Sequence, residues 1–253
     1  MLNHTAKMLV WDIESSSIDI LHRQYDLTVN TKRFRPEEIV RDWNIFSVAW
    51  KFIGHDKVNC VSVSSKNPTN DLEVVKMFHS VLMEADILIG HNSDAFDLKK
   101  FNARAIYHGL SPVPPKQQID TLKEARKHFK FTSNKLSYLA HFLGIDAKDD
   151  SPDWNKIIEG DSEELSTMRE YNKKDVIVTE QLYFKLQPWM KTHPNVSIYS
   201  PIKDIEGNKL ISCPKCNSMD YSLTGFHYLK SGKKQRYKCC GCGGFFQDGK
   251  IIK

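Results

Sequence analysis

Four acidic residues in three short motifs constrain the fold of this chain more than any other feature. Asp12 and Glu14 lie near the N-terminus, Asp97 lies near the middle of the chain, and Asp175 lies in its last third. Carboxylates that converge on one site repel each other and raise each other's pKa unless cations lie between them. Their oxygens are the ligands that Mg²⁺ and Mn²⁺ prefer. If the fold brings the four carboxylates together, we therefore expect them to form a binding site for divalent cations.

The first motif, Asp12 and Glu14, ends a strongly apolar run that begins at Met8. We expect residues 8–14 to form a buried strand. Alternate side chains of a strand point to the same face, so the two acids project together. A solvated strand end is the simpler interpretation of such a pair taken alone. Two acids at the end of a central strand are unfavourable unless a cation meets them, which favours the metal site.

The second and third motifs lie on predicted helices. Asp97 falls in the first turn of a helix that follows a short apolar strand, where an acid also complements the helix macrodipole. Asp175 follows Tyr171 by four residues, so both lie on one face of a later helix, and ordinary packing explains that pair equally well. Read together, the three motifs predict a two-metal centre of the kind that hydrolyses phosphodiester bonds, and therefore a nuclease.

The order Asp-x-Glu, Asn-x3-Phe-Asp, Tyr-x3-Asp resembles the motifs of the DEDD exonucleases of the RNase H-like superfamily. Glu170, not a histidine, lies five residues before Asp175, and Tyr171 lies four before it, which matches the tyrosine (DEDDy) branch. The second motif is similar to that of the proofreading domain of family B DNA polymerases. The resemblance covers residues 8 to about 190 and includes no polymerase palm. Two Cys-x2-Cys pairs near the C-terminus, Cys213 with Cys216 and Cys239 with Cys242, indicate a zinc ribbon. With that ribbon, the chain resembles small free-standing nucleases encoded by bacteriophages.

This resemblance implies a role for each catalytic residue. Asp12, Glu14, Asp97 and Asp175 would bind two Mg²⁺ or Mn²⁺ ions on either side of the scissile phosphate. One ion would activate a water molecule and the other would stabilise the leaving 3′ oxygen. The hydroxyl of Tyr171 would orient the attacking water, which is a positioning role because an unperturbed tyrosine titrates near pH 10.

The resemblance also implies contacts with the substrate. Asn92 and Phe96 would hold the terminal nucleotide, one by hydrogen bonding and the other by stacking. Core packing is an equally good interpretation of Phe96. A group of basic residues is expected either to contact phosphates or to form a solvated helix face: Lys123, Arg126, Lys127, Lys130 and Lys135.

The apolar pattern predicts an α/β fold in which helices flank a mixed β-sheet, and the resemblance makes that sheet RNase H-like. The expected strands are residues 8–14, 45–53, 57–64 and 85–90, with the second and third forming a hairpin. The expected helices are residues 70–83, 94–109, most of 121–144, and a long helix from Asp161 to the break at Pro188. Asp161 and Glu164 indicate a capping box at the start of the long helix.

Five of the six cysteines cluster near the C-terminus. Cys213 and Cys216, and then Cys239 and Cys242, form two Cys-x2-Cys pairs separated by 22 residues. Four thiolates with this kind of spacing are typical of one structural Zn²⁺ ion. Cys240 falls outside the two-residue spacing, so we exclude it. A segment this short has too little core to fold without a metal, and we therefore predict a zinc ribbon.

Positive charge is concentrated in the same part of the chain. Residues 1–200 carry 26 Lys and Arg against 27 Asp and Glu, whereas residues 201–253 carry 10 against 4, a net charge of +6. Aromatic residues alternate with these cations, which is typical of surfaces that bind nucleic acid. The residues concerned are Lys230, Lys233, Lys234, Arg236, Lys238, Phe226, Tyr228, Tyr237, Phe245 and Phe246. The alternative partner of the ribbon is a protein of replication or repair.

We therefore expect an exonuclease domain at residues 1–193, a linker at 194–208 and a zinc ribbon at 209–253. The sequence shows no signal peptide and no run of roughly 20 apolar residues, so we expect a cytoplasmic protein with no membrane partner, in the host cytoplasm for a phage protein. The predicted function is 3′–5′ exonuclease hydrolysis of DNA, at single strands or 3′ ends. The alternatives are an RNA 3′–5′ exonuclease of the same branch and an inactive nuclease fold that binds nucleic acid. The form of the second motif favours DNA, and the presence of all four acids argues against inactivation.

Overall fold

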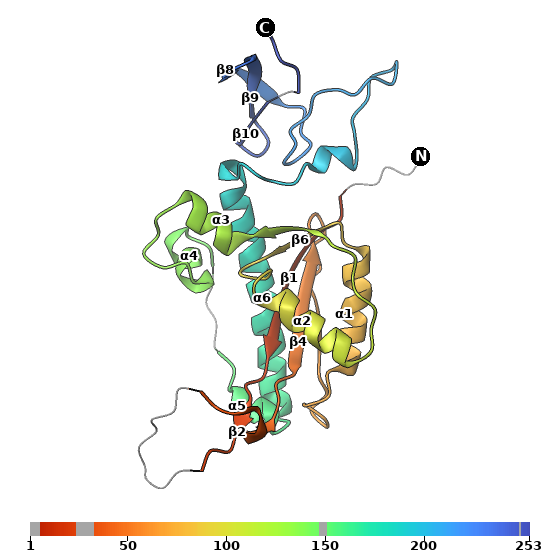
Figure 1. The fold of residues 1–253 in the computed structure, drawn as a ribbon, viewed down its shortest axis with the longest axis vertical. Coiled ribbons are helices and arrows are strands. Elements are labelled where there is room, and N and C mark those ends of the chain that lie inside the picture. Colours follow the sequence, from red (N-terminus) through yellow and green to blue (C-terminus); the bar gives the residue numbers. More distant parts are fainter. Residues whose placement is uncertain (1–5, 24–32, 147–150, 248) are drawn as a thin grey trace.

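The computed structural model describes residues 6–23, 33–146, 151–247 and 249–253. Its main body is a five-stranded sheet with helices on both faces, and a smaller three-stranded sheet lies at one end of the molecule (Figure 1). The expected α/β class, a mixed sheet flanked by helices, is confirmed.

The large sheet is mixed because one strand pairs in both senses. Its strands are β1 (Met8–Ser15), β4 (Ile45–Phe52), β5 (Asn59–Ser62), β6 (Ile87–Gly90) and β7 (Gln117–Asp120), in the order β5-β4-β1-β6-β7. β1 pairs antiparallel with β4 and parallel with β6, and is therefore the central strand. β4 and β5 form the hairpin that the sequence predicts.

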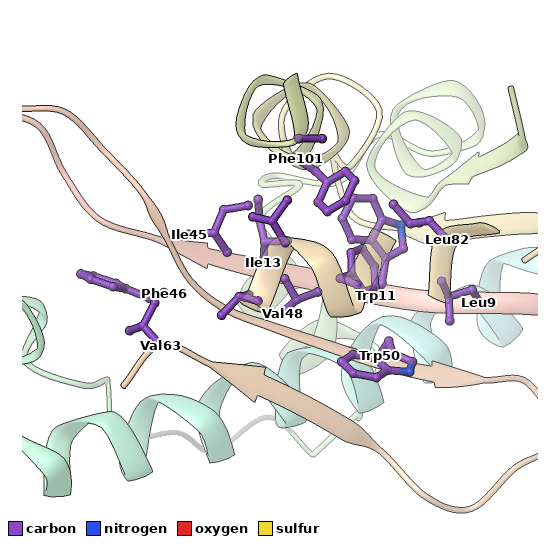
Figure 2. Close-up of a cluster of buried hydrophobic side chains, with 14 of the residues drawn as sticks. Leu9, Trp11, Ile13, Ile45, Phe46, Val48, Trp50, Val63, Leu82 and Phe101 are labelled. Carbon is purple, nitrogen blue, oxygen red and sulfur yellow. The ribbon is translucent and has the colours of Figure 1, made fainter. Parts of the chain in front are cut away.

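The two faces of the sheet are covered by different helices. α1 (Leu72–Glu84) and α2 (Asp97–Tyr107) cover the face that buries Leu9, Trp11 and Ile13 of β1. The Trp11 ring lies 5.1 Å from that of Phe78 in α1, and Figure 2 shows Trp11 directed toward Phe101 of α2. α3 (Thr121–His128), α4 (Leu136–Phe142) and α6 (Ser162–Leu186) pack on the opposite face.

α6 is the long helix that the sequence predicts, and it runs along the large sheet toward the three-stranded sheet (Figure 1). The Asp161 carboxylate caps it by accepting hydrogen bonds from the backbone N–H groups of Glu163 and Glu164, at 2.9 and 3.1 Å. The second half of the predicted capping box is replaced by another contact. The Glu164 carboxylate accepts from the backbone N–H of Asp153, at 3.0 Å, and so links α6 to the preceding helix, α5 (Trp154–Ile158).

Several short elements were not predicted from the sequence. β2 (Asp19–Ile20) and β3 (Ile39–Arg41) form a two-stranded sheet, and the 3-10 helix η1 (Pro36–Glu38) precedes β3. The Arg41 guanidinium holds the two strands together through two hydrogen bonds to the Asp19 carboxylate, at 2.8 and 2.9 Å. β2, β3 and α5 are too short to show a periodic pattern and lack the unbroken apolar run that marks the equally short β6, which is why they escaped prediction.

The C-terminal sheet has its own small core. β8 (Tyr221–Leu229), β9 (Gly232–Cys239) and β10 (Phe245–Gln247) pair antiparallel in the order β10-β9-β8. Tyr237 and Phe246 are buried against two of the cysteines. The preceding segment contains the 3-10 helix η3 (Val196–Ile198), and the backbone N–H of Val196 donates to the carbonyl of Pro214 at 2.8 Å. The domain limits at 193 and 208 remain predictions. No helix in the described part of the chain is long and apolar enough to cross a membrane.

Candidate active site

β1 delivers two carboxylates to the face of the sheet that α6 covers. Leu9, Trp11 and Ile13, which alternate with the acids along β1, are buried on the face that α1 covers. Asp12 and Glu14 point the other way and are half-buried. This orientation is the one that the sequence predicts.

Asp175 of α6 completes a cluster with the two acids of β1. One carboxylate oxygen from each of Asp12, Glu14 and Asp175 lies within 4.8 Å of the other two. Three hard oxygen donors at this separation form a suitable ligand set for Mg²⁺ or Mn²⁺.

Asp97, the fourth acid that the sequence singles out, lies next to this three-acid group. It is the first residue of α2, is 5% exposed, and accepts a hydrogen bond from the backbone N–H of Ile13 at 3.4 Å. Its charge raises the pKa of both Asp12 and Glu14, which places it electrostatically in the same cluster. The structure therefore brings Asp12, Glu14 and Asp175 within 4.8 Å of one another and places Asp97 beside Ile13 of β1, outside that three-acid group.

Burial and mutual repulsion make the charged forms of the clustered acids unfavourable in the absence of cations. Burial, followed by the charges of its acidic neighbours, raises the pKa of Asp12 well above its ordinary value. Burial and the charges of Asp175 and Asp97 raise the pKa of Glu14 to about 8. Burial raises the pKa of Asp97 to about 6, although the N–H of Ile13 opposes the shift. Cations between these carboxylates would remove the repulsion, so the donor set fits divalent ions.

Asn172 is a site residue that the sequence reasoning missed. Its side chain is fully buried, and its amide nitrogen donates to the Asp12 carboxylate at 2.8 Å. Its amide oxygen accepts from the hydroxyl of Ser47 on β4 at 2.9 Å. The amide therefore fixes the orientation of Asp12. A polar side chain at an apolar step of the helical repeat, between Met168 and Asp175, was the signal in the sequence.

Tyr171 lies on α6 one turn before Asp175, as the spacing predicts. Its ring is half-buried and meets the ring of Trp154 in α5 edge-on, with centroids 6.3 Å apart. Trp154 of α5 therefore packs against the Tyr171 ring. The role of the Tyr171 hydroxyl in orienting water remains a prediction.

The two expected nucleotide contacts lie between β6 and α2. Asn92 has a positive φ of 65°, and its backbone N–H donates to the Asp120 carboxylate at 2.9 Å. Phe96 is 46% exposed, so it is not a core residue and its ring is accessible. Their contacts with a nucleotide remain predictions.

Lys100 is a second residue that the sequence reasoning missed. Its ammonium donates to the Ser15 hydroxyl at 2.5 Å and lies 4.6 and 4.7 Å from the ring centroids of Trp43 and Phe96. Its charge lowers the pKa of Glu14 and of Asp97 against the larger effect of burial. It follows Asp97 by three residues on α2, which was the available signal in the sequence.

The four predicted zinc ligands form a second, separate cluster. The sulfur atoms of Cys213, Cys216, Cys239 and Cys242 all lie within 4.8 Å of one another. The closest pairs are Cys216 with Cys239, at 3.5 Å, and Cys213 with Cys242, at 3.7 Å. Four thiolates arranged in this way fit a tetrahedral Zn²⁺ ion. Cys240 is exposed and outside the cluster, as predicted.

The structure corrects one part of the predicted aromatic surface of the ribbon. Tyr237 and Phe246 stack on each other at 5.2 Å in the core beside the cysteines, so they are unavailable to stack on bases. Phe245 and Tyr228 are 54% and 76% exposed and remain accessible. Alternate residues of a strand face opposite sides, which explains why Phe245 is exposed and Phe246 is buried.

Comparisons with known proteins agree with this architecture. A family model described as the RNase_H superfamily matches residues 41–187, which is more than half of the chain. A search of the curated proteins finds no match.

Among solved structures, the family B DNA polymerase from the hyperthermophilic archaeon Pyrobaculum calidifontis is similar to this chain. The TM-score is 0.53 at 18% sequence identity, and the similarity covers 77% of this chain and 26% of the polymerase chain. At this level of identity the likeness concerns the fold, and the matched region spans about a quarter of the polymerase.

Proposed function

The chain belongs to the RNase_H superfamily, and on this premise we propose that it is a metal-dependent 3′–5′ exonuclease acting on DNA. The observation that carries the proposal is the convergence of Asp12, Glu14 and Asp175 within 4.8 Å, with the charge of Asp97 acting on the same group. Tyr171, one turn before Asp175, supports assignment to the tyrosine branch. Single strands or 3′ ends are the proposed substrates.

The four acids would hold two Mg²⁺ or Mn²⁺ ions, which supply a water molecule of lowered pKa and stabilise the leaving 3′ oxygen. The protein prepares these ligands before substrate arrives. The amide of Asn172 holds the Asp12 carboxylate, and the backbone N–H of Ile13 holds that of Asp97. Ligands fixed in this way need little reorganisation during the reaction.

Other residues would bind and orient the substrate. The Tyr171 hydroxyl would align the attacking water with the phosphorus atom. The exposed ring of Phe96 would stack on the terminal base, and Asn92 would hydrogen-bond the terminal nucleotide. The ammonium of Lys100, next to the Phe96 ring, would interact with a phosphate near the acids.

The cysteine cluster is proposed to bind one structural Zn²⁺ ion, within a ribbon of residues 209–253 that follows a linker at 194–208. The exposed cations of the ribbon support nucleic acid as its partner, ahead of a replication or repair protein. A phage origin and a location in the host cytoplasm remain proposals that rest on the sequence resemblance.

The proposed function is tested with one oligonucleotide sequence prepared as DNA and as RNA, each labelled at the 5′ end or at the 3′ end. With Mg²⁺, the 5′-labelled DNA should shorten as a ladder, and the 3′-labelled DNA should release labelled mononucleotide at once. RNA should be degraded more slowly. Faster loss of RNA would reassign the substrate, and no Mg²⁺-dependent loss of either strand would contradict nuclease activity.

A further inference from the structure

Two exposed aromatic side chains from different parts of the molecule line one groove. Trp189 belongs to the 3-10 helix η2 (Gln187–Trp189) that follows α6, and Phe245 is the first residue of β10. They are 60% and 54% exposed. Both line a groove of about 360 Å³ at the junction between the exonuclease body and the C-terminal sheet. Large aromatic side chains exposed on both sides of a groove indicate a surface that binds a ligand.

Buried polar contacts hold the two walls of this groove in place. Lys215 is 6% exposed, and its ammonium donates to the carbonyls of Gln187 and Pro188 at 3.2 and 3.0 Å. The Gln187 side chain in turn donates to the Lys215 carbonyl at 3.2 Å. A Cβ added to Gly244 would lie 2.9 Å from the Lys215 ammonium, so a larger residue there would displace the lysine from these carbonyls. The groove is therefore part of the fold.

The charge around the groove is suited to a polyanion. Among the described residues that line it none is acidic, whereas Lys191 and Lys215 are basic. Phe245 lies directly opposite Lys238 in the β9–β10 register, and Arg236 is exposed on the same face of β9. In proteins that bind a single strand, aromatic rings stack on the bases and neighbouring cations contact the phosphates.

α3 connects this groove to the acid site. Phe129, directly after the helix, packs edge-on against Trp189 with ring centroids 5.3 Å apart. At the other end of the helix, the Asp120 carboxylate accepts a hydrogen bond from the backbone N–H of Asn92 at 2.9 Å. Eight helical residues span about 12 Å, so a strand whose 3′ end lies at Asn92 has a short distance to cover.

We propose that the groove between Trp189 and Phe245 binds a base of single-stranded DNA upstream of the 3′ end held at the acid site. The inference rests on the proposed function, because that function fixes which end of the strand lies at the acids. Lys191, Lys238 and Arg236 contact the adjacent phosphates. In this proposal the C-terminal sheet contacts DNA through the face that carries Phe245, Lys238 and Arg236, where it meets η2.

The test measures binding of 5′-fluorescein oligothymidylates, about 3 to about 16 nucleotides long, to the zinc-loaded full-length Asp12→Ala protein. Affinity should increase in a step once the strand is long enough to reach the groove. Trp189→Ala and Phe245→Ala should each weaken binding of the longest strand by about tenfold, through loss of stacking, and leave the shortest strand unaffected. Trp189→Phe should retain most of the affinity.

Matched controls come from the other side of the junction. Phe184 is 47% exposed and lines a second groove there, so Phe184→Ala should leave binding unchanged. Lys238→Gln should reduce the slope of log affinity against log salt by about one, whereas Lys57→Gln, exposed on the β4–β5 turn, should not. Oligouridylates in the same series show whether the groove distinguishes DNA from RNA.

Equal affinity of the parent, Trp189→Ala and Phe245→Ala proteins for the longest strand would overturn the proposal and leave a protein partner as the occupant of the groove. Weaker binding by Phe184→Ala alone would also overturn it, in favour of the opposite groove. Failure of the proposed function is a separate result. It would appear as a protein with Asp12 intact that does not degrade the short oligothymidylate in Mg²⁺.

Discussion

The two clusters suited to metal ions in this molecule are built in opposite ways. The acid cluster lies on a five-stranded sheet with large buried cores on both faces, and the cysteine cluster lies on a three-stranded sheet whose core is a few aromatic residues and the cysteines themselves. In the first, the fold holds the ligands together against their repulsion. In the second, the ligands themselves make up much of what holds the fold together.

This difference indicates a catalytic role for the metal at the acid cluster and a structural role for the metal at the cysteine cluster. Carboxylates that the scaffold has already gathered can bind and release Mg²⁺ without refolding, which suits a catalytic ion. Thiolates on a segment with little other core couple metal binding to folding, which suits a structural ion. Lys215, between two of the cysteines, joins the regions because its buried ammonium binds the carbonyls that follow α6.

The largest expected effect is the loss of activity when the acid cluster is mutated and the cysteine cluster is left intact. Asp12→Ala should reduce kcat by at least about 10³-fold, because electrostatic stabilisation of the transition state is lost with a shared ligand. Circular dichroism and zinc content should be unchanged. Cleavage at the wild-type rate by a correctly folded Asp12→Ala protein would contradict the four-acid site.

Zinc removal should have the next largest effect, and on binding more than on chemistry. Stripping zinc with a chelator and then restoring Mg²⁺ should raise KM for a long single strand by about 10²-fold, through loss of stacking and phosphate contacts, while kcat on a short strand changes little. Cys216→Ser should behave in the same way. Cys240→Ser, which alters a thiol outside the cluster, is the matched control, and loss of zinc from it would show that the ligand set is wrong.

Asn172→Ala tests whether the scaffold prepares the acid site. Loss of the amide that holds Asp12 should lower activity, through weaker Mg²⁺ binding, by roughly 10- to 100-fold, and raising Mg²⁺ should restore part of it. Ser47→Ala, which removes only the hydrogen bond to the Asn172 amide oxygen, should cause a smaller loss. Equal Mg²⁺ dependence in Asn172→Ala and wild type would show that the amide is merely structural.

The last expected effect concerns stability and not activity: in the absence of divalent metal, stability should depend on pH. Glu14 has a pKa of about 8 in the folded protein against an ordinary 4.5, and Asp97 about 6 against 3.8. Between each pair of values the folded state keeps a proton that the unfolded chain releases. The free energy of unfolding should therefore fall as pH rises, by up to about 1.4 kcal/mol per pH unit for each group.

Urea denaturation at several pH values between about 5 and about 8 measures this slope, which added Mg²⁺ should flatten. Removal of the buried charge in Glu14→Gln should also flatten it. A metal-free wild-type protein whose stability does not change over this range would mean that burial and repulsion do not raise the pKa values of Glu14 and Asp97.

The long elements and the four acids could be predicted from the sequence because each leaves a local pattern. The apolar strand before Asp12, the hairpin and the repeat of α6 are periodic, and the acid motifs have fixed spacing. β2, β3 and α5 are too short for periodicity. Asn172 and Lys100 carry only weak local signals, because their importance arises from contacts with Asp12 and Ser15, residues distant in sequence. The groove at Trp189 likewise depends on how the segment after α6 meets β10, which is distant in sequence.

A Mn²⁺ titration of the zinc-loaded full-length protein, with free Mn²⁺ followed by electron paramagnetic resonance, tests the central claim most directly. We predict two bound Mn²⁺ ions per chain for the wild type and no more than one for Asp175→Asn, with one zinc ion per chain retained by both. A wild-type protein that binds no Mn²⁺, or an Asp175→Asn protein that binds as many ions as the wild type, would contradict the assignment of the acid cluster as the catalytic metal centre.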